Sequence, residues 1–272
     1  MNPTPQPIRL IFNADDFGFT RDVNEGIVEA HRNGVLTATT LMANGDAFDH
    51  AVSCAKDTPT LDVGVHLVMV QGESVSSPGR ALPATLQELA RALMRRELPV
   101  YNEAVAQVRR IIAAGIQPSH IDTHKHTHLF PPVLDALARV AREFDIPWVR
   151  RPFDFQPSAR AGTLTRFVSA GMKRMGPRFA TRLAALKTTD HFIGFQMTGG
   201  LDTAAMIETL GNLPPGLTEF MCHPGNCGPE LRSASTRLKE SRAIELAALT
   251  SPEVRRVIDR RGIQITSYRL IG

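Results

Sequence analysis

The chain has 272 residues, of which 43% are hydrophobic and 21% are charged, and its formal net charge is +4. This composition predicts a packed core and excludes a disordered protein, and the small positive charge does not indicate a nucleic-acid partner. Cys54, Cys222 and Cys227 cannot all pair with one another, which is more typical of a reducing cytosol than of secretion. The first residues, MNPTPQP, lack the features of a signal peptide, and no run approaches the ~20 apolar residues of a transmembrane helix. We therefore expect a cytoplasmic protein.

Strand-like and helix-like segments alternate along the whole chain. We expect strands at 8–12, 37–42, 61–70, 120–123, 148–150, 188–193, 217–222 and 263–266. We expect helices at 23–33, 47–56, 86–96, 102–114, 132–144, 204–210, 238–249 and 252–261. This alternation predicts an α/β fold of mostly parallel strands with outer helices, open or closed into a barrel. Residues 1–272 show neither an internal repeat nor a second domain, so a single domain is expected.

One segment, residues 155–189, departs from this regular pattern because it contains no Asp or Glu. Its cations are Arg160, Arg166, Lys173, Arg174, Arg178, Arg182 and Lys187. Phe167, Val168, Met172, Met175 and Phe179 are interleaved with them at roughly helical spacing. The segment is therefore predicted to be a basic, partly amphipathic helical insertion.

Acids and histidines gather where the expected strands end. Asp15 and Asp16 follow the apolar run 8–12, and His66 closes the strand VGVHL. His124 is the first histidine of the cluster THKHTH, which follows the strand at 120–123, and His223 follows the strand EFMC. Because the carboxyl ends of parallel strands meet on one face of an α/β fold, these side chains are expected to share one site.

The residue types in this set favour one kind of chemistry. An aspartate and two neutral histidines bind a divalent cation and leave coordination positions open, with zinc, magnesium, manganese and cobalt all acceptable. Such a cation makes water a better nucleophile and polarises a carbonyl group. A neighbouring carboxylate can accept the proton of the water, and a separate histidine can protonate a leaving group. These are the groups needed to hydrolyse an amide.

At these positions the sequence resembles a known family. The motifs NADDFG, VGVHL, HIDTHKHTHLFP and CHPG occur in this order and resemble the YdjC-like carbohydrate deacetylases. Characterised members of that family remove acetyl groups from sugars that contain N-acetylglucosamine. The stretches GVLTATTLMANGDAFDHA, HLVMVQG and ELAALTSPEVR are similar to the hopanoid-biosynthesis-associated branch called HpnK, which is thought to act on the sugar head group of a hopanoid lipid. The resemblance implies a barrel-like fold similar to that of the polysaccharide deacetylases.

The resemblance also implies a role for each matching residue. Asp16, His66 and His124 would bind one divalent metal ion, with magnesium or zinc expected first. Asp15 would be the general base, and His223 would be the general acid.

A further match is offered by Arg151, which lies in the segment Arg150-Arg151-Pro152-Phe153. The polysaccharide deacetylases carry an Arg-x-Pro-aromatic motif that orients the base, and Arg151 is the expected counterpart. An alternative is that an arginine at a strand end only pairs with a nearby acid.

Several alternatives stay open at this point. His126 and His128 can contact the metal ligands or the substrate, and Cys222 is more typical of a small buried residue than of a nucleophile. The chain can also be a non-catalytic lipid- or membrane-surface binding protein that uses the basic insertion, or a metal-dependent phosphoesterase. The expected partners are a free or lipid-linked amino sugar and an anionic surface at the inner face of the membrane. The oligomeric state is open, with a homodimer as one alternative.

Overall fold

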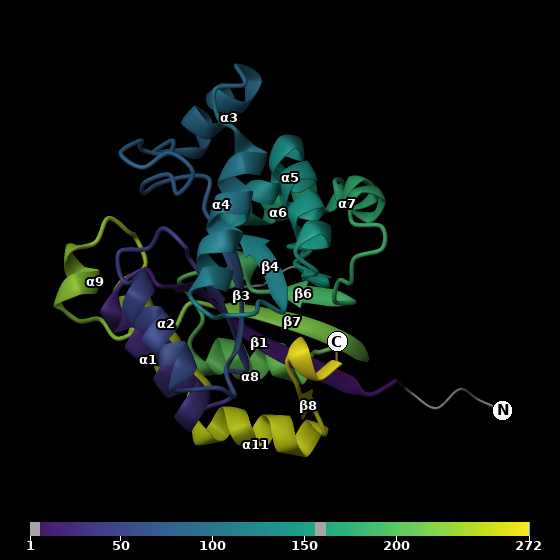
Figure 1. Ribbon diagram of the computed structural model, residues 1–272. Helices are drawn as coiled ribbons and strands as arrows, with labels where there is room; N and C mark the ends of the chain where they lie inside the picture. The colour runs from purple at the N-terminus through teal and green to yellow at the C-terminus, as the bar shows by residue number, and fades with distance from the viewer. Residues whose placement is uncertain (1–5, 156–161, 272) are drawn as a thin grey trace.

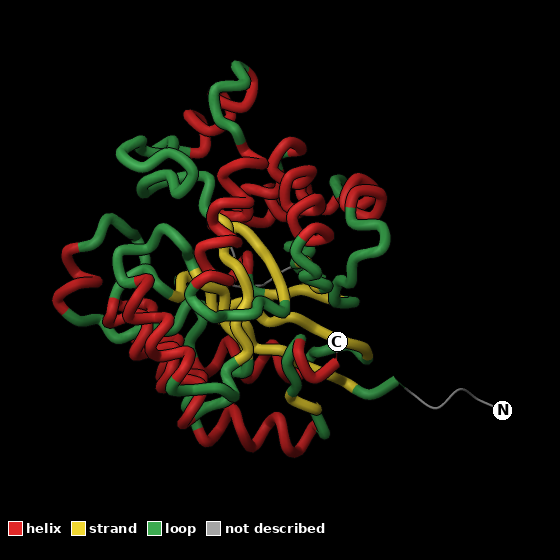
Figure 2. The backbone as a smooth tube through the Cα atoms, viewed as in Figure 1, coloured by secondary structure: helices red, strands yellow, loops and turns green. Residues whose placement is uncertain are grey.

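A parallel sheet forms the centre of the protein (Figures 1 and 2). The computed structural model describes residues 6–155 and 162–271. The strands are β1 (Ile8–Phe17), β2 (Ala38–Leu41), β3 (Asp62–Leu67), β4 (His120–Thr123), β5 (Trp148–Val149), β6 (His191–Ile193), β7 (Gly216–Cys222) and β8 (Gln264–Ile265). They are arranged in the order β5-β4-β3-β2-β1-β7-β6, and β8 pairs with β1. Every pairing between these strands is parallel, so their carboxyl ends all face the same way.

The two edges of the sheet approach each other. Near β5, the backbone N–H of Val149 donates a hydrogen bond of 2.9 Å to the backbone carbonyl of Lys187. Near β6, the N–H of Phe155 donates one of 2.9 Å to the carbonyl of Phe192. Parallel bridges accompany both contacts. The sheet therefore curls into a barrel-like shape, and the predicted α/β barrel-like fold is confirmed.

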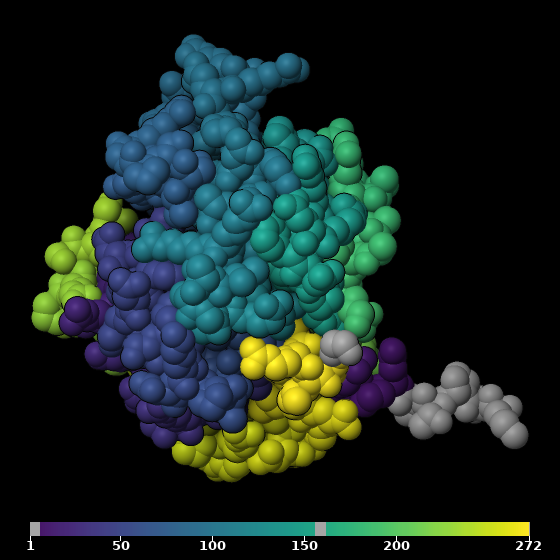
Figure 3. Space-filling view, in the orientation of Figure 1, coloured from purple at the N-terminus to yellow at the C-terminus, as the bar shows by residue number. Residues whose placement is uncertain are grey.

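Helices cover the outside of this sheet. They are α1 (Arg21–Asn33), α2 (Phe48–Lys56), α3 (Leu86–Met94), α4 (Val100–Ala113), α5 (Pro131–Glu143), α6 (Thr163–Lys173), α7 (Gly176–Arg182), α8 (Thr203–Gly211), α9 (Pro229–Ser233), α10 (Glu240–Leu249) and α11 (Pro252–Arg261). Short 3-10 turns are η1 (His124–Leu129), η2 (Phe195–Met197) and η3 (Arg269–Ile271). The pairs α1 and α2, α4 and α5, and α8 and α11 lie side by side (Figure 1). The space-filling view shows α3 standing away from the body at the top of the molecule (Figure 3).

Local signals set the ends of these elements. Helix α1 begins at Thr20, whose hydroxyl accepts a hydrogen bond from the N–H of Val23, and α11 ends at Gly262 in the left-handed conformation. The interior is apolar around the centre of the sheet, where the rings of Phe12 and Phe220 lie 5.2 Å apart. Strand β1 is longer than expected, because it continues past residue 12 through both acids to Phe17.

Within the described residues, the basic segment contains α6 and α7; Arg160 lies outside them. Met172 and Phe179 are buried, and the ring of Phe179 lies 4.9 Å from that of Phe153. Phe167 behaves differently, since 74% of it is exposed. The two helices therefore pack on the barrel but leave some apolar side chains of α6 in solvent. In the described ranges, the helices are all too short or too polar to cross a membrane.

Candidate metal and catalytic site

Both adjacent acids reach the same side of the sheet because β1 is irregular at this point. Alternating residues of a regular strand face opposite ways, so Asp15 and Asp16 would be separated. The pairing register between β1 and β2 shifts between Ala14 and Phe17, which is the signature of a bulge. Asp16 has a positive φ of 69°, a left-handed conformation that is uncommon outside glycine. The bulge therefore brings both carboxyl groups, each in a residue that is 4% exposed, into the interior.

Asp16, His66 and His124 meet at one point. Oδ1 of Asp16 lies 3.0 Å from Nδ1 of His124 and 3.4 Å from Nε2 of His66. The same two histidine nitrogens lie 3.3 Å from each other. The residues come from β1, from β3 and from the start of η1, which follows β4. All three therefore lie at the carboxyl ends of strands. The structure thus brings together the three residues expected to bind metal.

These donor atoms fit a small divalent cation. Two ligands bound at about 2.0–2.1 Å to one cation lie roughly 2.8–3.4 Å apart in octahedral or tetrahedral geometry. The three separations fall in that range. Oδ1 of Asp16 is also buried and has no hydrogen-bond partner among the described residues, which is costly for a carboxylate oxygen unless a cation satisfies it. The donor set therefore suits a metal ion, and it does not distinguish magnesium from zinc.

Asp122 fixes the orientation of His66. The two residues face each other across β3 and β4, and Nδ1 of His66 lies 2.6 Å from Oδ1 of Asp122. This contact leaves Nε2 of His66 directed at Asp16, the arrangement found in histidines that bind metal. Burial alone lowers the pKa of His66, but Asp122 and the two adjacent acids outweigh it and raise the pKa to about 10. The site therefore attracts positive charge.

A second set, Asp15, His66 and Asp122, also places its donor atoms within 4.8 Å of one another. These acids already contact a cationic side chain, that of Arg150. The guanidinium group of Arg150 donates two hydrogen bonds of 2.6 and 2.8 Å to the carboxylate of Asp15, and its Nη1 lies 2.5 Å from Asp122. The metal is thus expected at Asp16, with Arg150 serving as the counter-ion of Asp15.

Arg150 also holds Glu219, whose Oε1 accepts a hydrogen bond of 2.6 Å from Nε. Burial works to raise the pKa of Asp15, but Arg150 holds it well below its usual value, so Asp15 is ionised at neutral pH. The arginine that orients Asp15 is therefore Arg150. Arg151, expected in this role, lies elsewhere and donates to the backbone carbonyl of Asp190 over 3.2 Å.

Helix α10 contributes two charged side chains that sequence analysis missed. Arg242 is buried and contacts Oδ2 of Asp16, the oxygen that does not face the histidines. Glu245, one turn further along, accepts a hydrogen bond of 2.6 Å from the backbone N–H of His223. His223 lies at the end of β7 and is 8% exposed. Burial lowers the pKa of His223 to about 4, although Asp15 and Asp16 oppose that effect.

His126 and His128 have different surroundings. Two consecutive left-handed residues, Lys125 and His126, turn the chain just after His124. His126 is 7% exposed, its Nδ1 has no hydrogen-bond partner in the parts of the chain described, and its ring lies 5.5 Å from that of Phe195. His128 is fully buried beside Phe179, with its Nδ1 2.6 Å from the hydroxyl of Thr123. Neither is among the residues that meet at Asp16.

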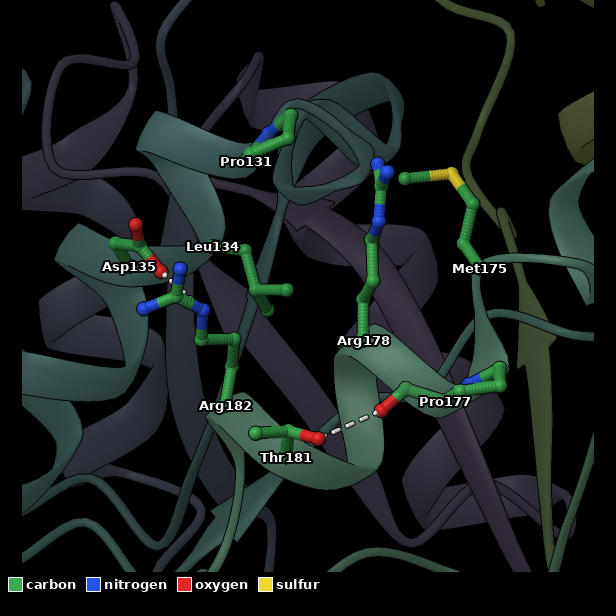
Figure 4. Close-up of a pocket in the computed structure, with 8 residues that line it drawn as sticks. All are labelled: Pro131, Leu134, Asp135, Met175, Pro177, Arg178, Thr181 and Arg182. Carbon is green, nitrogen blue, oxygen red and sulfur yellow. Dashed lines mark hydrogen bonds and ion pairs between the residues drawn. The ribbon is translucent and has the colours of Figure 1, made fainter.

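A pocket of about 380 Å³ lies away from this site, between α5 and α7 (Figure 4). Its lining includes Leu134, Met175, Arg178 and Arg182, and none of the expected site residues. Arg182 pairs with Asp135 across the pocket at 3.1 Å. The pocket therefore belongs to the packing of the basic helices and is separate from the metal site.

The sequence is similar to those of known proteins over nearly its whole length. Residues 9–260 match the family model described as YdjC-like protein. A carbohydrate deacetylase of Brevibacillus brevis is 34% identical over 269 residues, which cover 97% of this chain and 100% of that protein. A carbohydrate deacetylase of Vibrio campbellii is 33% identical over 270 residues, which cover 96% of this chain and 95% of that protein.

Solved structures agree with the fold. A protein of Enterococcus faecalis V583, provisionally named a cellobiose-phosphate cleavage protein, superposes with a TM-score of 0.77 at 26% identity. The superposition covers 98% of this chain and 99% of that one. An uncharacterised protein of Agrobacterium tumefaciens C58 superposes with a TM-score of 0.53 at 10% identity, which is evidence for a shared fold alone.

Proposed function

The chain belongs to the YdjC-like protein family, and we propose that it is a metal-dependent hydrolase that removes the acetyl group from an N-acetylated amino sugar of the N-acetylglucosamine type. The observation that carries this proposal is the pair of adjacent acids with different partners. Asp16 meets two histidines in a metal-type arrangement, while Asp15 is ionised and held by Arg150. The relatives named carbohydrate deacetylase, at 33–34% identity over nearly the whole chain, support the same reaction.

Asp16, His66 and His124 would hold the cation. When bound, it would increase the acidity of a water molecule and polarise the carbonyl group of the substrate amide. Asp122 keeps Nε2 of His66 directed at this position, and Arg242 binds the second oxygen of Asp16. Both contacts reduce the freedom of the ligands before substrate arrives.

Proton transfer would fall to Asp15 and His223. Asp15 takes a proton from the attacking water as the new carbon–oxygen bond forms, and Arg150 keeps the carboxylate in one orientation. His223 donates a proton to the nitrogen of the amine as the carbon–nitrogen bond breaks. The products are acetate and a free amino sugar. Asp15 acts to raise the pKa of His223, which supports the proposal that the two groups act on one substrate.

We assign the sugar head group of a hopanoid lipid as the finer substrate, which places the protein in the cytoplasm and at the inner face of the membrane. The stretches HLVMVQG and ELAALTSPEVR, similar to the hopanoid-associated branch, support this assignment. A free N-acetylglucosamine oligosaccharide is the competing substrate. The two differ in the part of the molecule far from the acetyl group, so the chemistry of the site is the same for both.

The test is acetate release from N-acetylglucosaminyl substrates, measured with and without a chelator. We expect release that stops with chelator and returns when magnesium or zinc is added back. The variant Asp15→Asn is the inactive control, because it keeps the proposed metal ligands and lacks only the proposed general base. Binding of substrate without acetate release would favour a non-catalytic binding protein, and phosphate release from phosphate esters would favour a phosphoesterase. Comparing a free oligosaccharide with an amino-sugar lipid in vesicles would then identify the substrate.

A further inference from the structure

Helix α6 presents an apolar face to solvent. Leu164 is 78% exposed, Phe167 74% and Val168 45%. Positions that are three and four residues apart lie on the same side of a helix, so these three side chains form one continuous strip. We call them the α6 strip. Exposed apolar side chains are common singly, whereas contiguous apolar patches often mark sites of protein or membrane interaction.

The strip stays in solvent because α6 is packed on the barrel through other side chains. Ser169 and Met172 are buried against the barrel, and the hydroxyl of Ser169 accepts a hydrogen bond of 3.1 Å from the side chain of Gln196. Rotating α6 to bury the strip would remove these contacts. The strip therefore stays in solvent unless another surface covers it.

The charge of the neighbouring residues indicates what that surface is. Residues 163–182 contain five cations and no Asp or Glu, so α6 and α7 together are strongly basic. Arg182 is paired with Asp135 of α5, whereas Arg178 extends beside Met175 at the rim of the α5–α7 pocket (Figure 4). Arg174, the residue that caps α6, is exposed. Apolar side chains flanked by arginine and lysine are typical of helices that lie in the interface of an anionic membrane.

We propose that α6 docks on an anionic lipid bilayer, with the α6 strip inserted among the acyl chains and the flanking cations against the lipid phosphates. Charge complementarity selects this occupant, because residues 163–182 carry five cations and no Asp or Glu and so attract a uniformly negative plane. Three apolar side chains form too small a strip for the core of a stable protein interface. They suit shallow insertion, in which charge and apolar burial act together.

The position of α6 connects this surface to the candidate site. Ser169 contacts Gln196 of η2, and the neighbouring Phe195 contacts the ring of His126, which lies two residues after the metal ligand His124. Docking through α6 would hold that side of the barrel near the membrane. An amino sugar carried by a lipid would then reach the site without leaving the bilayer, a consequence that rests on the proposed function, whereas docking itself does not.

The experiment is co-sedimentation of the full chain with vesicles of phosphatidylcholine, with and without phosphatidylglycerol, at low and high salt. We expect binding to the anionic vesicles at low salt, and loss of that binding as salt screens the cations. The double variant Leu164→Ser with Phe167→Ser should bind at least about tenfold more weakly, because the inserted apolar area is lost. Arg174→Glu with Arg178→Glu should weaken binding at least tenfold as well, since each cation near such a surface contributes about a factor of five.

Matched controls lie on other faces. Met94 on α3 is 77% exposed and Arg260 on α11 is exposed, so Met94→Ser and Arg260→Glu should leave binding unchanged. Deacetylation of a soluble N-acetylglucosaminyl substrate should be the same in all of these variants.

Protein that stays in the supernatant at low salt would overturn the proposal, and so would undiminished binding after the α6 substitutions. If instead those substitutions dissociate an oligomer in sedimentation velocity, the strip is an interface between copies of the chain. If the unaltered protein does not deacetylate the soluble substrate, the proposed function is contradicted, whereas the docking proposal is unaffected.

Discussion

The two halves of the barrel contribute different kinds of residue to the candidate site. Strands β1 to β4 and the turn after β4 supply the cluster of acids and histidines at Asp16. The later half supplies the groups around them: Arg150 after β5, Glu219 on β7, His223 directly after β7, and Arg242 on α10. The first half thus carries the proposed metal ligands, while the second half carries the charged groups around them and the proposed general acid.

This difference suggests that metal binding and proton transfer can be separated by mutation. The two halves meet at both acids, since Arg150 from the second half binds Asp15 and Arg242 contacts Asp16. Changes to the proposed ligands Asp16, His66 and His124 should remove the metal. Changes to Asp15, Arg150 or His223 should keep the metal and alter the rate or its dependence on pH.

The largest effect is expected for the ligands themselves. Replacing Asp16 with Asn, or His66 or His124 with Ala, should weaken metal binding more than about 100-fold, because even the outer partners of metal ligands are worth about 10- to 100-fold. Elemental analysis of protein dialysed without added metal would measure this. His31→Ala, a change on α1 outside the site, is the matched control. Full occupancy in any of the three variants would remove that residue from the ligand set.

Asp15→Asn should show the opposite behaviour. The variant should retain the metal and lose about 10²- to 10⁴-fold in turnover, since a general base has been removed from an otherwise complete site. Metal content and acetate release measured on the same sample would test both parts. If Asp15→Asn loses its metal while Asp16→Asn keeps it, the two acids have exchanged roles.

Arg150 and Arg151 offer a comparison between neighbours. Arg150→Lys keeps the charge but cannot reproduce the paired hydrogen bonds to Asp15 together with the contact to Glu219. We expect a loss of about 10² in turnover through misplacement of the base, with metal retained. Arg151→Lys should change turnover little, because its guanidinium contacts only the backbone of Asp190 in the structure described here. Equal effects of the two substitutions would contradict the assignment of Arg150.

The smallest effect is expected in the shape of the pH profile. Asp15 must be ionised and His223 protonated during turnover, so the rate should rise with pH and then fall. Burial lowers the pKa of His223 to about 4, so the fall should begin on the acid side of neutrality. In His223→Ala this alkaline limb should flatten, and the rate should be lower at its maximum. An unchanged limb would give the acid role to another group, with His126 the next residue to test.

The sequence predicted most of the fold because its apolar runs and helix patterns are regular. The positions of Asp16, His66 and His124 followed from the ends of strands, where neighbouring chain segments must converge. Arg150 was harder to predict, because two consecutive arginines follow a strand of two residues and only the register of that strand decides which one faces inward.

Other groups gave weaker signals. Asp122 alternates with His124 in HIDTH, so its position on the same face as the ligand could have been predicted from the strand pattern. Arg242 and Glu245 could not, because charged residues on an outer helix usually face solvent and only the packing of α10 directs them inward. The bulge in β1 was also absent from the pattern, although two adjacent acids sharing one site require some break in the alternation of a strand.

The barrel closes between two of its shortest strands, β5 with two residues and β6 with three. A few hydrogen bonds hold this seam, among them the contacts of Val149 with Lys187 and of Phe155 with Phe192, whereas β1 pairs with β7 along seven residues. Local opening should therefore be easiest at the seam, and its amides should exchange with deuterium sooner than those of β1 and β7. Arg150 follows β5 directly, so each opening would loosen its hydrogen bonds to Asp15 and its contact with Asp122, the residue that orients His66.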